Sequence, residues 1–148
     1  MSDYQRILVA IDCSDDSPAL LRRACALAAS ARDINLIHVI EPLALAYGAD
    51  VPMDMSDLQN SLSERARDTA QRYAAEFSIP LKQVYVELGS IEKTIQDKAD
   101  KLGADLIVVG SHTRSGLAIL LGSTARGLVP GAHCDVLAVK IEKRKKDD

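Results

Sequence analysis

Five short apolar runs, rich in β-branched residues, recur along the chain and alternate with segments of helical periodicity. Runs without polar alternation are typical of parallel strands buried on both faces of a sheet. The order βαβαβαβαβ therefore predicts an α/β fold, with a doubly wound five-stranded parallel sheet and helices on both faces. The runs cover residues 6–11, 35–40, 83–88, 105–110 and 135–140.

The chain of 148 residues has the length of one domain and shows no internal repeat, so we expect a single domain over residues 1–148. Residues 41–55 lack a clear period and are expected to form a long loop, and residues 141–148 a flexible charged tail. Ser17 and Ser90 are expected to cap helices. Pro130 should end the last helix by about Val129, because proline lacks an N–H and clashes with the preceding turn.

Composition, the length of the apolar runs and the spacing of the cysteines argue against several classes of protein. A net charge of −3 and an aromatic content of 3% argue against a nucleic-acid-binding surface. No apolar run approaches the ~20 residues of a membrane span, and the first run is too short for a signal peptide. Three widely spaced cysteines without a metal-binding pattern are typical of a reducing compartment. We expect a cytoplasmic protein without nucleic-acid or membrane partners.

A polar loop follows the first run, at the carboxyl end of a strand, where ligands bind in open α/β sheets. It contains Asp12, Asp15 and Asp16. These carboxylates would repel a bare phosphate, but they suit a ribose, a base or a divalent cation beside phosphates. In the same loop, Cys13 is either a small residue that packs against its neighbours or a redox-sensing thiol. His38, in the second run, is expected to be a hydrogen-bonded polar residue of the core.

A second polar loop, after the fourth run, suits an anion. It begins at Gly110 and leads to Gly122, Ser123 and Thr124, where a helix would offer free N–H groups and its positive dipole end. Arg114 could clamp a phosphate with two hydrogen bonds. The same residues fit a structural role, with Gly110 ending a strand and Ser123 capping a helix. The residues alone leave both interpretations open.

Familiar nucleotide-binding and signalling motifs do not match. No G-x-G-x-x-G follows the first run and no Gly-Lys-Ser/Thr occurs, which excludes dinucleotide-binding and P-loop signatures. A flavodoxin would place its phosphate loop where this chain is acidic. A receiver domain needs an aspartate at the end of the third strand, where this chain has Glu87, Leu88 and Gly89.

The sequence resembles the universal stress protein family, most strongly the members with an ATP-binding type of glycine loop. The resemblance covers nearly the whole chain, in the stretches RILVAIDCSDDSPALLRRA, LIHVI, GADLIVVGSHTRSG, LLGSTARGLV and CDVLAVK. It implies the strand order 3-2-1-4-5 and a dimer. One subgroup binds ATP through Gly-x-x-Gly, nine residues and Gly-Ser/Thr, and another subgroup lacks that motif and does not bind ATP.

Carried over to this chain, the resemblance implies that Asp12 contacts the ribose or a metal and that Ala10 and Val39 line the adenine pocket. Two departures affect the phosphate loop: Thr113 replaces the second glycine, and the spacer of residues 114–121 has eight residues. A β-branched residue resists a positive φ. The cofactor expected is ATP, with or without Mg²⁺. Taken together, the candidate cofactor-binding residues are Ala10, Asp12, Val39, Val109, Gly110, Thr113, Arg114, Gly122, Ser123, Thr124 and Ala125.

Three functions follow. The first is an ATP-binding regulatory protein of the stress response, and the second is a nucleotide-free dimeric scaffold, which Thr113 favours. The third is a slow ATPase or autophosphorylating protein with Ser111, Ser123 or Thr124 as acceptor; it ranks last because no general base is evident. The fifth strand would be a sheet edge, which invites antiparallel pairing of two copies. The expected homodimer interface is Val136, Leu137, Ala138, Val139 and Lys140.

Overall fold

A parallel sheet of five strands in the order β3-β2-β1-β4-β5 forms the centre of the molecule, as predicted. The computed structural model describes residues 3–13, 15–42, 56–110, 127 and 130–140. The strands are β1 (Ile7–Ala10), β2 (Ile34–Ile40), β3 (Val84–Leu88), β4 (Leu106–Gly110) and β5 (Asp135–Val139). The helices are α1 (Ser17–Leu27), α3 (Ser56–Glu76) and α4 (Ile91–Leu102).

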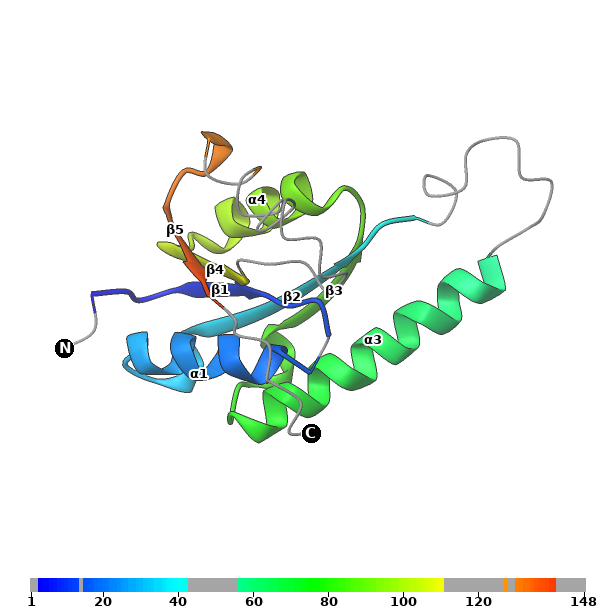
Figure 1. Cartoon of the computed structure of the whole chain (residues 1–148), viewed down its shortest axis with the longest axis horizontal. Helices are drawn as coiled ribbons and strands as arrows, with labels where there is room; N and C mark the ends of the chain where they lie inside the picture. The colour runs from blue at the N-terminus through cyan, green and yellow to red at the C-terminus, as the bar shows by residue number, and fades with distance from the viewer. Residues whose placement is uncertain (1–2, 14, 43–55, 111–126, 128–129, 141–148) are drawn as a thin grey trace, which may run out of the picture.

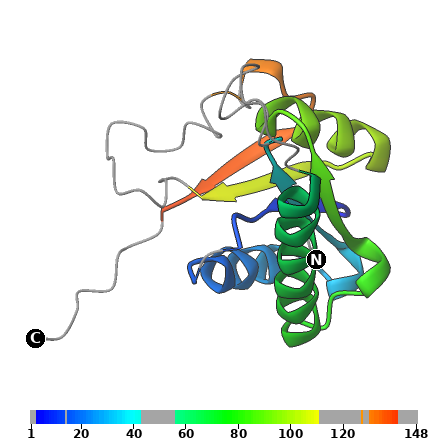
Figure 2. The same cartoon turned by 90° about the vertical axis from the view of Figure 1, so that its right-hand side faces the viewer.

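Helices cover both faces of the sheet, with α1 and α3 on one side and α4 on the other (Figure 1, Figure 2). Successive residues of a strand point to opposite faces. Accordingly, Ile7 and Val9 of β1 pack in the core on the α1 and α3 side, while Leu8 packs with Ile95 on the α4 side. All three β1 residues are fully buried. The central strand must therefore be apolar at every position, which explains its uninterrupted run.

The helix boundaries follow the capping signals to within one residue. α1 begins at Ser17, and Asp16 is the N-cap, so the cap lies one residue before the one predicted. Ser90 is the N-cap of α4. Gly103 ends α4 in the left-handed conformation, with φ +65°, which glycine adopts without steric cost.

The prediction for Pro130 was wrong. Pro130 and Gly131 are themselves helical, so helical structure is present after Val129. A Cβ added to Gly131 would lie 2.6 Å from Nε2 of Gln96, which shows that this turn packs closely on α4. A proline in a last turn also removes only one helical hydrogen bond. Tertiary packing therefore outweighs the local cost of the proline.

Candidate functional site

The order of the strands reverses at β1, where the chain passes from one half of the sheet to the other. From β1, one part of the chain forms β2 and β3 on one side, and the later part forms β4 and β5 on the other. Val9 of β1 is in register with Leu36 of β2 and with Val108 of β4. The carboxyl ends of β1 and β4 therefore lie side by side. In doubly wound sheets, this switch point is where a ligand crevice opens.

Four predicted site residues lie at this edge. Ala10, Val39 and Val109 share the α4 face of the sheet. Val109 is buried, whereas Ala10 and Val39 are half-buried. Gly110 is the last residue of β4 and is also half-buried. The ends of β1 and β2 thus leave a partly covered apolar surface of the kind that lines sites for small ligands.

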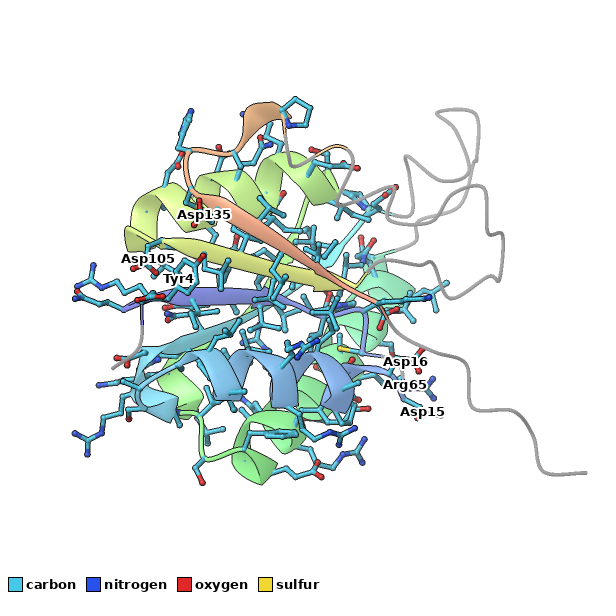
Figure 3. The ribbon with its side chains drawn as sticks, turned by 60° about the vertical axis from the view of Figure 1, so that its left-hand side comes forward. Tyr4, Asp15, Asp16, Arg65, Asp105 and Asp135 are labelled. Atoms are coloured by element: carbon cyan, nitrogen blue, oxygen red, sulfur yellow. The ribbon has the colours of Figure 1, made fainter. Side chains whose placement is uncertain are left out.

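Carboxylates follow β1 at the same edge. Asp12 and Asp15 are exposed, and Asp16 is half-buried. Figure 3 shows Asp15 and Asp16 at this end of the molecule, together with Arg65 of α3. Across the described part of the chain, no group of three or more His, Cys, Asp or Glu side chains is placed to hold a metal ion. A single exposed carboxylate such as Asp12 suits a ribose hydroxyl, or a cation that is also held by oxygens of a ligand.

Cys13 turns the chain away from this edge. Its φ of +60° is left-handed, which is uncommon for a residue other than glycine. The Sγ atom lies 3.8 Å from the carbonyl oxygen of Ala66 in α3. Burial, and to a lesser degree the charge of Asp12, raises the pKa of the Cys13 thiol to about 11. The thiol therefore stays protonated at neutral pH, which favours a packing role over redox sensing.

His38 of β2 is half-buried, and its Nδ1 lies 2.7 Å from the carbonyl oxygen of Ile11. The expectation of a hydrogen-bonded histidine is thus confirmed. The sequence did not reveal its partner, because the two residues are 27 positions apart and the contact depends on strand register. The alternation of side chains along β2 predicts on which face of the sheet His38 lies, but it does not predict the hydrogen-bond partner.

The predicted phosphate-binding residues lie outside the described residues, and their assignments stay predictions. After Gly110, the description of the chain resumes at Gly127. A Cβ added to Gly127 would lie 2.6 Å from Cγ of Glu92, so this point of the last helix contacts α4. The residues concerned are Thr113, Arg114, Gly122, Ser123, Thr124 and Ala125, together with the possible acceptor Ser111.

A separate hollow of about 490 Å³ lies at the opposite, amino-terminal end of the sheet. There the Tyr4 hydroxyl donates a hydrogen bond to Oδ2 of Asp135, at 2.8 Å. This hydrogen bond is the largest of the effects that raise the pKa of Tyr4. Figure 3 shows Tyr4, Asp105 and Asp135 together at this end, away from Asp15 and Asp16. The hollow is lined by Tyr4, Arg23, Leu27, Leu106, Asp135, Val136 and Leu137.

Among the described residues, none of the helices is long and apolar enough to cross a membrane. The strand order, the helices on both faces and the switch point at β1 define a doubly wound α/β protein. The chain belongs to the universal stress protein family, whose model matches residues 3–140. It is 39% identical to universal stress protein A homolog 2 of Coxiella burnetii over an alignment of 149 residues. The alignment covers 96% of this chain and 99% of that relative.

Solved structures of similar proteins support the same fold. The hypothetical protein MJ0577 superimposes with a TM-score of 0.78 at 25% identity, covering 96% of this chain and 99% of its own. A universal stress protein in complex with cAMP superimposes with a TM-score of 0.55 at 25% identity, covering 94% of this chain and 98% of its own. The predicted family and the predicted fold are both confirmed.

Proposed function

We propose that this universal stress protein is a cytoplasmic regulatory protein that binds ATP, with Mg²⁺ at the phosphates, at the carboxyl edge of its sheet. The observation that carries the proposal is the half-buried apolar surface of Ala10 and Val39 beside the exposed carboxylate of Asp12. The apolar surface suits an adenine ring, and the carboxylate suits ribose hydroxyls or Mg²⁺. A family member of similar fold binds cAMP, which contains the same adenosine unit, and this supports the proposal.

The remaining site residues have roles along the nucleotide. Val109 and Gly110 lie against the ribose and phosphates, and Arg114 pairs with a phosphate beside Thr113. The proposed role is binding rather than turnover, so that bound ATP changes the surface offered to a partner protein. The phosphates are held by backbone N–H groups and hydroxyls of Gly122, Ser123, Thr124 and Ala125.

Calorimetric titration of nucleotide-stripped protein with ATP, dATP and cAMP, each with and without Mg²⁺, tests the proposal. We expect ATP to bind with a dissociation constant on the order of micromolar. Asp12→Ala should weaken ATP binding about tenfold or more, because it removes a charged hydrogen-bonding partner. If Asp12 holds the ribose, this variant loses the preference for ATP over dATP. If it holds Mg²⁺, the loss occurs only when the metal is present.

Two further variants locate the site. Gly122→Val should abolish ATP binding, because a side chain there would block the approach of the phosphates to the backbone. Asp97→Ala removes an exposed carboxylate on α4, paired with Lys93 at 3.6 Å, and should bind ATP as the wild type does. Intact, folded protein that binds none of the three nucleotides would overturn the proposal.

A second candidate, a nucleotide-free dimeric scaffold, is favoured by the character of β5. Within the described sheet, β5 is an edge strand. Val136 and Leu137 are half-buried, whereas Ala138 and Lys140 are exposed. The stretch between Asp135 and Lys140 is apolar, and an apolar edge of this kind invites antiparallel pairing with a second copy. This candidate and the ATP-binding candidate share the homodimer and differ in the ligand.

Sedimentation of the wild type and of Ala138→Glu tests the dimer. The substitution places like charges close to each other across a two-fold axis, and it should weaken dimerisation at least about tenfold. Ala75→Glu, on the exposed side of α3, is the matched control and should leave the dimer intact. A wild-type monomer at micromolar concentration would contradict the interface. A dimer that binds no nucleotide would favour the scaffold.

A further inference from the structure

The hydrogen bond of His38 lies where β1 separates from β2. β1 ends at Ala10, which is in register with Ile37 of β2. Ile11 still donates its N–H to the carbonyl of Ile37, at 2.9 Å. In a continued parallel ladder, the carbonyl of Ile11 would accept the next backbone N–H of β2. Instead this oxygen lies 2.7 Å from Nδ1 of His38, so a side chain of β2 takes the place of a backbone donor.

The chemistry of this contact fixes the position of a proton. A backbone carbonyl only accepts hydrogen bonds, so Nδ1 of His38 must carry the hydrogen. The neutral ring protonated at Nδ1 and the imidazolium both satisfy this requirement, whereas the neutral ring protonated only at Nε2 does not. The contact therefore selects one neutral tautomer, and this selection can be measured.

The residues that follow Ile11 show what the contact controls. Asp12 is exposed at the carboxyl edge, and Cys13 turns the chain with φ +60°. Since the ladder stops and the turn comes within two residues, the orientation of the Ile11 peptide sets the direction in which Asp12 leaves the sheet. We infer that His38 is a positioning residue, whose Nδ1–H holds the Ile11 carbonyl and thereby aims Asp12 at the nucleotide; this rests on the proposed function.

The first experiment needs no variant. ¹⁵N spectra of the imidazole groups, recorded on nucleotide-free wild-type protein at neutral pH, should show Nδ1 of His38 protonated. Exposed His133, whose Nδ1 lies 3.1 Å from Oδ1 of Asp100, serves as an internal comparison. A neutral His38 ring with its proton on Nε2 would overturn the inference.

The second experiment uses two substitutions at the same position. His38→Val removes the donor and introduces a side chain that suits a strand, and His38→Asn keeps an N–H near the position of Nδ1. His38→Val should weaken ATP binding about tenfold, the effect of one lost hydrogen bond. His38→Asn should restore the affinity to within about threefold of the wild type. His133→Val, the matched control, should leave the affinity unchanged.

Amide hydrogen exchange at Asp12 and Cys13 separates this inference from the proposed function. Exchange should be faster in His38→Val than in the wild type, and His38→Asn should restore it, with nucleotide absent throughout. If the wild-type protein fails to bind ATP, the proposed function is wrong. The exchange data would still show whether His38 positions the backbone at Asp12. Unchanged exchange in His38→Val, or unchanged ATP affinity where the wild type binds, would overturn the inference.

Discussion

The two ends of the sheet are held together differently. At the amino-terminal end, Asp105 accepts hydrogen bonds from the backbone N–H groups of Gln5 and Arg6, at 2.8 and 3.0 Å, and so ties the start of β1 to the start of β4. At the carboxyl end, Asp12 is exposed, and His38 contacts the carbonyl oxygen of Ile11, the residue after β1, through its side chain. Asp105 therefore stabilises the backbone at the amino-terminal end, whereas at the carboxyl end a histidine holds the backbone next to β1.

Residues in the left-handed conformation occur at both ends of the sheet. Gly103, before β4 at the amino-terminal end, has φ +65°, and Cys13, after β1 at the carboxyl end, has φ +60°. Glycine adopts this conformation freely, whereas a side chain costs about 1–2 kcal/mol there. Cys13 therefore carries a conformational cost at the end where we propose the ligand binds, and Ser78, with φ +61° before β3, carries a similar cost at the amino-terminal end.

The largest effect is expected from Asp105→Ala. The variant removes two charge-assisted hydrogen bonds between strands and should lower the free energy of unfolding by about 2 kcal/mol, with ATP affinity unchanged. Urea denaturation and calorimetry measure the two quantities. Asp97→Ala, which breaks only an exposed pair on α4, should stay within about 0.5 kcal/mol of the wild type. A loss of ATP affinity in Asp105→Ala would break the distinction between the two ends.

Gly103→Ala should have the next largest effect. Alanine must adopt φ +65°, so the free energy of unfolding should fall by about 1.5 kcal/mol. Its Cβ would lie 3.2 Å from Nη1 of Arg6, the mobile end of a side chain that donates to the Leu102 carbonyl. Gly103→Asn is the control, since asparagine tolerates this conformation better. Equal stability of the two variants would show that steric contact, rather than φ, sets the cost.

A paired substitution at Cys13 measures the strain at the carboxyl end. Cys13→Gly and Cys13→Ala both remove the thiol, so the difference between them isolates the conformational cost of φ +60°. The glycine variant should be more stable than the alanine variant by about 1 kcal/mol in urea denaturation. Two variants of equal stability would mean that this turn relaxes once the thiol is lost, and that the carboxyl end stores no strain.

The sequence predicted the five strands because all five read as apolar runs, most clearly the central strands β1 and β4, which are almost wholly buried on both faces. The five runs match the five strands with boundaries that shift by one residue or none, and Ser90 is the N-cap of α4 as predicted. The strand order came from the family resemblance rather than from the periodicity. Pro130 was misjudged because local propensity says nothing of the close packing of Gly131 on α4.

The candidate site could be predicted only in part. The family resemblance assigned Ala10, Val39, Val109 and Gly110 to one site, and the structure has them at one edge because the carboxyl ends of parallel strands lie there. The contact between His38 and Ile11 could not be foreseen, since it joins a side chain to a backbone group in a neighbouring strand. Such contacts depend on register, which no local pattern of residues determines.

The smallest expected effect concerns the thiol of Cys13. Its pKa of about 11 in the folded protein exceeds the usual value near 8.5 of an unfolded chain. The neutral thiol therefore contributes its full stability below about pH 8.5, and this contribution is lost as the pH rises toward 11. Between pH 8 and 10, the stability advantage of the wild type over Cys13→Ala should shrink by less than about 1 kcal/mol, because solvent reaches part of this group. Urea denaturation of both proteins across this range measures the change.

An advantage that stays constant would show that ionisation of the thiol is no harder in the folded protein. Solvent would then reach the thiol of Cys13 freely, and the carboxyl end would be more open around this residue than its burial indicates.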